Sequence, residues 1–285
     1  MKGFLKIIHI LKGQLLASFC EVRVWIGYAI GIMVALKGEY VFRQYAGERV
    51  FQMFEPYIMN FQTVGNVTLM LLGFVIVISD APFINQRSAL TLYRTSRGQW
   101  FWAMTLYITV HSVMYFVISV AASAIFNIGQ AYAANLWSRP MDNLARFQST
   151  EALVKWNLAS PGELLVTEYS PYRALFFTLL LIWLYSLILA ELLFLLNARF
   201  NKAAGTIAAA AVHAIGYILM FDGITFIGKN LSLYYHGLFS NHVSGSISIV
   251  TSVCYLLLVL CILLFTGPAL LSRADFSVLA GEKSG

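Results

Sequence analysis

The stretch SDAPFINQRSALTLYRTSRGQW, residues 79–100, is polar, whereas the sequence on both sides of it is strongly apolar. The flanking apolar runs cover residues 64–78 and 101–126. The stretch holds one acid, Asp80, and three arginines, and its Pro82 disfavours a helix that continues through it. Two long apolar segments joined by a short basic connector predict two membrane helices with a cytoplasmic loop between them.

The composition of the whole chain is that of a membrane protein. Of its 285 residues, 59% are hydrophobic and 11% are charged, and the mean hydropathy is +0.74. Soluble domains usually carry about 25% charged residues. The formal net charge of +6 does not indicate nucleic-acid binding, because no basic stripe and hardly any soluble part are present to carry it. The sequence therefore predicts an all-α integral membrane protein and excludes a soluble enzyme.

The apolar segments predict six transmembrane helices within a single domain, residues 21–271. A helix needs about 20 mostly apolar residues to cross a bilayer, and each segment meets that length approximately. Lys37 and Glu39 are expected to mark the outer end of the first span, and Gly267-Pro268 the end of the sixth. The predicted spans cover about residues 24–42, 61–79, 100–126, 174–196, 203–221 and 246–270.

The N-terminal segment, residues 1–20, has the pattern of an amphipathic helix on the cytoplasmic surface of the membrane. Its lysines are set largely apart from its apolar side chains, which recur at helical spacing. The alternative is an ordinary cytoplasmic extension of the first span. The apolar positions are Phe4, Ile7, Ile8, Leu11, Leu15 and Phe19.

Basic residues predict the orientation. With both termini in the cytoplasm, the two short loops at 80–99 and 197–202 are cytoplasmic, and short loops carry most weight in the positive-inside rule. The bases of these loops are Arg87, Arg94, Arg97, Arg199 and Lys202. The longest outer loop is then 127–173, in which Pro140 is expected to start a helix that reaches Trp156, and 272–285 is a cytoplasmic tail. We expect a multi-pass protein of the cell membrane.

Small residues indicate close helix packing in two places. Gly27 and Gly31 form a G-x-x-x-G pair in the first span, and the fifth span contains the run AAGTIAAAAVHAIG. Small side chains at such spacing let helix backbones approach closely, either within one chain or across a dimer. The candidate residues of the fifth span are Gly205, Ala208 and Ala209.

Three ionisable residues fall inside predicted spans. Glu191 is expected to pair with a base at the same depth, and a proton or cation relay is the alternative. His111 and His213 are expected at similar depth, about ten residues from the cytoplasmic starts of their spans. They predict hydrogen-bonded intramembrane histidines, and the alternative is the axial pair of a b-type haem. The bases available to the glutamate are Arg23, Arg199 and Lys202.

Motifs for soluble catalysis are absent from the sequence. It contains no G-x-x-x-x-G-K-[ST] phosphate loop, no H-E-x-x-H and no G-x-S-x-G, and it offers no plausible intramembrane carboxylate pair. We therefore expect no catalytic residue, no metal site and no cofactor on this chain. Its three cysteines lack metal-ligand spacing and are expected to be ordinary small hydrophobes.

The organisation as a whole resembles the type-2 ATP-binding-cassette (ABC) permeases. The shared features are a surface helix at the N-terminus, six spans, a basic loop at 79–100 and an apolar, glycine-broken last outer segment. The sharpest local match is SDAPFINQRSALTLYRTSRGQWFWAMTLYI, which looks like the loop between the second and third helices of these permeases. They are bacterial membrane subunits, usually exporters, that work as dimers with separate ATPase subunits.

The resemblance implies a role for each segment. Residues 1–20 would be the elbow helix, 81–97 would contain the coupling helix that docks on the ATPase, and the first and fifth spans would form the dimer contact. ATP and Mg²⁺ would bind the partner ATPase, and an amphipathic cargo would leave the cytoplasm. The residues that would contact the ATPase are Pro82, Phe83, Arg87, Leu90, Leu92, Tyr93, Arg94 and Arg97.

Two alternatives stay open from the sequence. The alternatives to such a permease subunit are a non-transporting membrane scaffold or immunity protein and a haem protein that uses the two histidines. Positive-inside topology alone explains the loop arginines, but it does not explain Ala81-Pro82-Phe83 or the amphipathic run at 88–93. The 127–173 loop is also longer than in many permeases of this group, which puts the substrate type in doubt.

Overall fold

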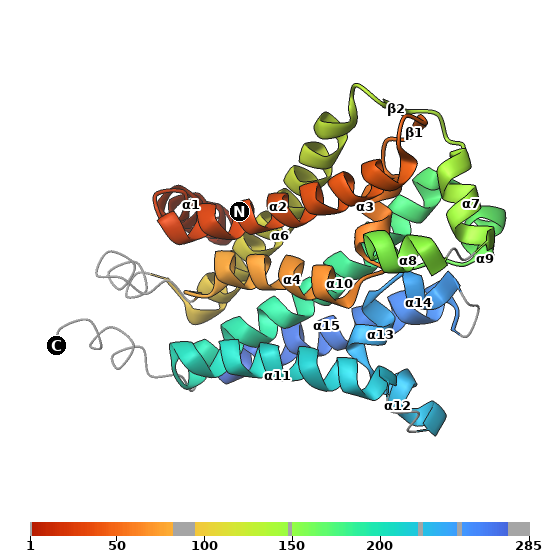
Figure 1. Ribbon diagram of the computed structural model, residues 1–285. Helices are drawn as coiled ribbons and strands as arrows, with labels where there is room; N and C mark the ends of the chain where they lie inside the picture. The colour runs from red at the N-terminus through yellow and green to blue at the C-terminus, as the bar shows by residue number, and fades with distance from the viewer. Residues whose placement is uncertain (1, 82–94, 148–149, 222–224, 244–246, 273–285) are drawn as a thin grey trace.

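The protein is described by a computed structural model that covers residues 2–81, 95–147, 150–221, 225–243 and 247–272. Helices dominate, and the long ones pack side by side in one bundle (Figure 1). The described flanks of the 79–100 loop and the end of the helix that stops at 272 lie at the same end of the bundle, which we call the loop end (Figure 1). The opposite end carries the described parts of 127–173, which we call the cap (Figure 1).

Five helices are long and apolar enough to cross a membrane, counted over the described residues. Their length and composition confirm an all-α membrane protein with several spans. These helices are α2 (Val22–Ala46), α6 (Arg97–Asn127), α10 (Pro171–Arg199), α11 (Lys202–Phe221) and α15 (Ile249–Ser272).

The predicted span at 61–79 corresponds to a shorter helix, α4 (Val64–Ile78). Its 15 residues extend over about 22 Å, less than the roughly 30 Å of a hydrocarbon core. A separate short helix, α3 (Glu55–Asn60), precedes it. The prediction began this span three residues too early, because residues 61–63 form a turn between the two helices.

The helix of the first predicted span continues past Lys37 and Glu39, and the point at which it leaves the membrane stays a prediction. Helix α2 continues to Ala46, and the Glu39 side chain is fully buried. Its carboxylate accepts hydrogen bonds from Ser123 Oγ and, at 2.5 Å, from Asn127 Nδ2, both on α6. Two polar side chains of the neighbouring helix therefore satisfy the hydrogen-bonding groups of an ionisable residue in the interior.

The helix of the sixth predicted span continues past Gly267-Pro268, since α15 includes Pro268 and stops at Ser272. Just before the proline, Gly267 lies against α6. A Cβ atom there would come within 2.4 Å of the Phe101 ring. The Thr266 hydroxyl donates to the Ile262 carbonyl at 2.8 Å within the same helix.

Helix α10 is the core of the bundle and packs against α6, α11 and α15. Its buried side chains include Leu181, Tyr185 and Phe194, and they occur all around the helix. An apolar helix buried on most faces is expected at the centre of a bundle. The other helices are therefore arranged around α10, which links the cap to the loop end.

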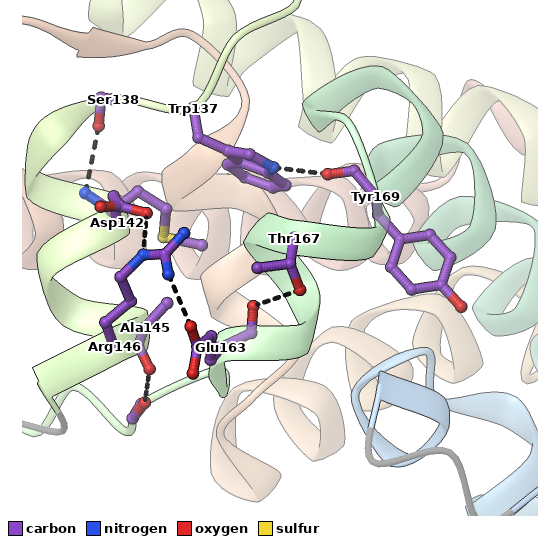
Figure 2. Close-up of polar contacts among 10 residues, drawn as sticks. Trp137, Ser138, Asp142, Ala145, Arg146, Glu163, Thr167 and Tyr169 are labelled. Atoms are coloured by element: carbon purple, nitrogen blue, oxygen red, sulfur yellow. Dashed lines mark hydrogen bonds and ion pairs between the residues drawn. The ribbon is translucent and has the colours of Figure 1, made fainter.

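The cap packs on the bundle rather than forming a domain of its own. It contains β2 (Ala131–Tyr132), α7 (Arg139–Phe147), α8 (Thr150–Trp156) and α9 (Glu163–Glu168). Strand β2 pairs in parallel with β1 (Phe51–Gln52), and buried α7 side chains share a cluster with α2 and α10. In Figure 2, Arg146 of α7 lies between Asp142 of its own helix and Glu163 of α9.

Of the helix predicted from Pro140 to Trp156, the described residues are helical, as α7 and α8, and residues 148 and 149 between them lie outside the described residues. The chain leaves α8 through Asn157, whose φ of 54° is left-handed, and enters α9 through Gly162 at φ 85°. Both values favour residues that tolerate a left-handed backbone, and asparagine and glycine are the ones that do. After α9 the chain reaches Tyr169, next to the start of α10. Figure 2 shows the Trp137 indole pointing to the Tyr169 carbonyl.

A buried carboxylate attaches the cap to α3. Both oxygens of Glu55 accept hydrogen bonds from Ser138, one from its N–H and one from its hydroxyl, each at 2.6 Å. The Gln52 N–H adds a third at 3.2 Å. Burial nevertheless raises the pKa of Glu55 to about 7, because desolvation of the charged form outweighs these bonds.

The last outer segment folds back into the bundle through α12 (Thr225–Leu231), α13 (Leu233–Gly237) and α14 (Ser240–Val243). Helix α13 packs between α10, α11 and α15. Its N-cap residue, Ser232, donates from its hydroxyl to the Gly216 carbonyl of α11 at 2.6 Å. This hydrogen bond ties the start of α13 to α11.

The N-terminal segment is a helix, α1 (Lys2–Ser18), that packs against α6. Ile10 is buried, and Ile7, Leu11 and Leu15 pack against the core, whereas Phe4 is 65% exposed. The helix expected over residues 1–20 is thus present. Its apolar side chains divide between the bundle and the surface of the molecule.

Candidate functional site

The candidate site is the base of the 79–100 loop, where the loop joins α4 and α6. Its flanks, residues 79–81 and 95–100, are described, and they show how the loop is attached. Of the predicted coupling residues, Arg97 lies in these flanks. The others, Pro82, Phe83, Arg87, Leu90, Leu92, Tyr93 and Arg94, lie outside the described residues.

Arg23 of α2 caps the end of α4. Its Nη1 donates to the carbonyls of Ile76 at 2.7 Å and Val77 at 2.9 Å, and its Nε lies 3.2 Å from an oxygen of Asp80. The last carbonyls of a helix lack partners within the helix, and a cation there also interacts favourably with the helix dipole. Arg23 therefore connects α2 to the end of α4 and to Asp80 at the start of the loop.

Asn197 of α10 is fully buried and joins three segments. Its Nδ2 donates to the carbonyls of Ser79 at 3.2 Å and Ala81 at 2.9 Å. Its Oδ1 accepts from the Gly205 N–H of α11 at 2.9 Å. One amide side chain thus holds the start of the loop against α10 and α11.

The other end of the loop enters α6 through a capping box. The Ser96 hydroxyl accepts from the Gln99 N–H, and the Gln99 side chain accepts from the Ser96 N–H, both at 3.3 Å. Arg97 Nη1 donates to the Leu271 carbonyl of α15 at 3.2 Å. This end is therefore tied to the last helix of the chain.

Together these contacts link the base of the loop to α2, α10, α11 and α15, in addition to the two helices that it joins. The links are hydrogen bonds and one ion pair, so they fix direction as well as distance. A displacement of the loop would therefore act on most of the bundle. The geometry of the site is thus that of a junction between helices.

Glu191 does not form the ion pair that was expected of it, and that prediction is wrong for the described residues. The side chain is 1% exposed on α10, and Oε2 accepts from Thr105 Oγ1 of α6 at 3.4 Å. Within the described part of the chain, Oε1 has no hydrogen-bond partner. Arg23, one of the bases proposed for it, instead pairs with Asp80.

His111 joins α6 to α1 and α2. Its Nε2 lies 3.0 Å from Ser18 Oγ, and its Nδ1 lies 3.0 Å from Tyr28 OH. The imidazole is fully buried, and the Tyr107 ring centroid is 4.5 Å from its own. The end of the N-terminal helix is therefore held to the bundle through this histidine.

His213 forms a second node, on α11. Its Nε2 lies 3.0 Å from Thr68 Oγ1 of α4, and its Nδ1 lies 3.0 Å from Tyr185 OH of α10. The two histidines thus have different neighbours, and hydroxyl groups occupy all four ring nitrogens. This arrangement fits hydrogen-bonded intramembrane histidines better than two ligands of one haem.

The small residues proposed for dimer packing are mostly used inside the chain. A Cβ atom at Gly27 would lie 2.6 Å from the Gly73 carbonyl of α4, and one at Gly31 would lie 2.6 Å from the Tyr115 ring of α6. A Cβ atom at Gly205 would lie 2.1 Å from a carbonyl of α10. Ala209 is buried and Ala208 half-buried, so a dimer contact by α2 and α11 stays a prediction that other side chains would have to carry.

Comparisons with known proteins add nothing to these observations, because no family model, curated protein or solved structure matches the chain. Among the described residues, no group of three or more His, Cys, Asp or Glu side chains is placed to hold a metal ion. The absence of a cofactor stays a prediction. A functional argument therefore depends on the geometry of the chain itself.

Sequence reasoning missed the two residues that anchor the loop, Arg23 and Asn197. Arg23 was considered only as a partner for Glu191, and Asn197 only as part of a basic turn. One signal was available, since each is a polar residue near the loop end of a predicted span. The pattern alone does not tell that Arg23 reaches the backbone at the end of α4 and that Asn197 reaches the backbone at the start of the loop.

Proposed function

We propose that this chain is the membrane-spanning subunit of an ATP-driven exporter, in which the 79–100 loop receives movement from a separate ATPase subunit. The observation that carries the proposal is the attachment of both ends of this loop to the other long helices through Arg23, Asn197 and Arg97. A loop that only connects two spans has no need of such links.

In this proposal the chain crosses the membrane six times, through the five long helices and through α4, which is the second span in chain order. Both termini and the 79–100 loop lie in the cytoplasm, and the cap lies outside. The basic residues of the short loops support this orientation. Helix α4 is short, and α3 in front of it extends the same segment toward the cap.

The transport cycle would follow from the mechanical links. ATP and Mg²⁺ bind between two ATPase subunits, each of which docks on the 82–97 segment of one permease subunit. Closure of the ATPases displaces the loop, and Arg23 and Asn197 transmit the displacement to α2, α10 and α11. Two permease subunits then open a path for an amphipathic cargo such as a lipid, glycan, peptide or drug.

The test is to replace residues 82–94 by an equally basic linker of glycine and serine while retaining Arg97. The variant and the parent chain are each co-expressed with the ABC ATPase encoded beside this gene. We expect the parent chain to purify with the ATPase and to alter its rate of ATP hydrolysis. We expect the linker variant to lose the complex, or to lose its effect on hydrolysis.

A suitable control is Arg146→Ala in the cap, which breaks exposed ion pairs far along the chain from the loop. It should retain the complex and the hydrolysis rate. The proposal fails if the parent chain binds no ATPase. It also fails if the linker variant behaves like the parent, a result that favours a non-transporting scaffold.

Orientation has a separate test. In a chain whose native cysteines, Cys20, Cys254 and Cys261, are replaced by serine, single cysteines are introduced as Ser88→Cys and Leu136→Cys. A membrane-impermeant maleimide should label the cap position, which is 70% exposed, in intact cells. It should label the loop position only after lysis, and the reverse pattern would overturn the proposed orientation.

A further inference from the structure

An apolar groove lies between α6 and α10 in the half of the bundle nearest the cap. Its volume is about 540 Å³, and every residue that lines it is apolar or aromatic. On α6 the lining runs from Val113 to Ala124, and on α10 from Phe176 to Trp183. Phe54, just before α3, closes the groove at the cap end.

The groove opens to the side of the bundle rather than to either end. Val117 and Phe176 line it and are each 59% exposed, on two helices that are long and apolar enough to cross a membrane. The surface around such helices is the hydrocarbon of the bilayer. The groove is therefore open to lipid chains and not to water.

The length of the groove matches one leaflet. The distance along α6 from Val113 to Ala124 is about 16 Å at 1.5 Å per residue. Half of a hydrocarbon core is about 15 Å.

The inner end of the groove offers no free polar group. The Trp183 indole N–H, which is the polar atom of that side chain, already donates to Ser112 Oγ at 2.9 Å. A ligand in the groove would therefore meet only carbon surface, and it would gain about 25 cal/mol for each Å² of apolar surface that it buries.

An arginine, Arg173, lies on α10 toward the cap from the groove, although it is not one of the residues that line it. Tyr172 and Arg173 precede Phe176 by about one helical turn, and both are exposed. The Arg173 guanidinium lies 5.8 Å from the centre of the Tyr169 ring, and Phe54 packs edge-on against Tyr172 at 6.1 Å. An arginine at this depth suits a phosphate group at the membrane surface.

We propose that the groove binds one acyl chain of an anionic phospholipid, with the headgroup phosphate beside Arg173. The chain enters from the leaflet next to the cap and ends near Trp183. This site is inferred independently of the transport function, because it needs neither an ATPase nor a second copy of the chain.

The test uses the full-length protein in lipid nanodiscs that contain a phosphatidylglycerol with a photoreactive group in its acyl chain. After irradiation, peptide mass spectrometry locates the adducts. We expect adducts on residues 113–124 and 176–183 above the level on other exposed helix surfaces. Ala121→Trp fills the groove and should lower these adducts about tenfold, the change that corresponds to about 1.4 kcal/mol of binding free energy.

The matched control is Cys254→Trp, which adds similar bulk at an exposed position of α15 outside the groove. It should leave the groove adducts unchanged, and equal unfolding temperatures of the two variants show that both are folded. Arg173→Gln should remove any preference for phosphatidylglycerol over phosphatidylcholine. Adducts spread evenly over all exposed helices, or a change of oligomeric state in Ala121→Trp without groove adducts, would overturn the proposal.

Discussion

Replacing Asn197 by alanine tests whether the base of the loop is held as the structure indicates. The change removes three hydrogen bonds and leaves the carbonyls of Ser79 and Ala81 and the Gly205 N–H without that partner. A buried polar group that loses its partner costs about 1–3 kcal/mol. At the low end of that range, three such groups lower the free energy of unfolding by about 3 kcal/mol.

The neighbouring Asn201 provides the control. It is exposed, and its Oδ1 accepts from the N–H groups of Ala203 and Ala204 as the N-cap of α11. Asn201→Ala should cost about 1 kcal/mol, the usual loss for an N-cap. Chemical unfolding in micelles gives both values, and hydrogen exchange should increase across 79–100 in Asn197→Ala alone. Equal costs and equal exchange in the two variants would refute the role assigned to Asn197.

Three further predictions concern other contacts. The folded state holds a proton on Glu55 more tightly than the unfolded state, so the contribution of this group to stability is greatest below about pH 4.5 and falls by about 3 kcal/mol as the pH rises through about 7. Gly205→Ala should destabilise by about 1–3 kcal/mol because α10 is too close, whereas Gly65→Ala, in open space on α4, should stabilise by about 0.5–1 kcal/mol. His111→Phe should speed hydrogen exchange in α1, because it removes the bond to Ser18.

Each of these predictions has a clear contradicting result. For the buried carboxyl, unfolding midpoints from pH 5 to 8 should show a slope that Glu55→Gln makes less steep, and a slope that this change leaves unaltered would refute the assignment to Glu55. For the glycines, denaturant unfolding that shows the same sign of effect at both positions excludes close packing as the cause. For the histidine, unchanged exchange in α1 would mean that apolar contacts alone hold that helix.

The general fold could be predicted from the sequence because hydrophobic length is a direct signal. All five long helices fall on predicted spans, and the N-terminal helix follows from the spacing of its apolar residues. The predicted ends of the spans were less accurate than their positions in the chain. Glu39 was read as the outer end of a span, because the sequence does not show that Ser123 and Asn127 satisfy its charge inside the bundle.

The candidate site could be located from the sequence but not built from it. The polar stretch at 79–100 stands out between apolar runs, whereas its anchors depend on contacts between residues more than 50 positions apart, such as Arg23 with Val77. For Glu191, in contrast, the sequence predicted a contact that the described residues do not contain. Charge balance predicted a base for it, and the packing of α6 and α10 places a threonine there instead.

The contact between Glu55 and Ser138 also constrains the order in which the protein is made. Ribosomes add about 5–20 residues per second, so the partner of Glu55 emerges roughly 4–17 s after the carboxylate itself. During that interval the short β1 strand lacks β2 as well, since both partners lie in the cap. The segment between α2 and α4 therefore lacks both partners until α6 and the start of the cap have been made, and assembly of the cap covers it afterwards.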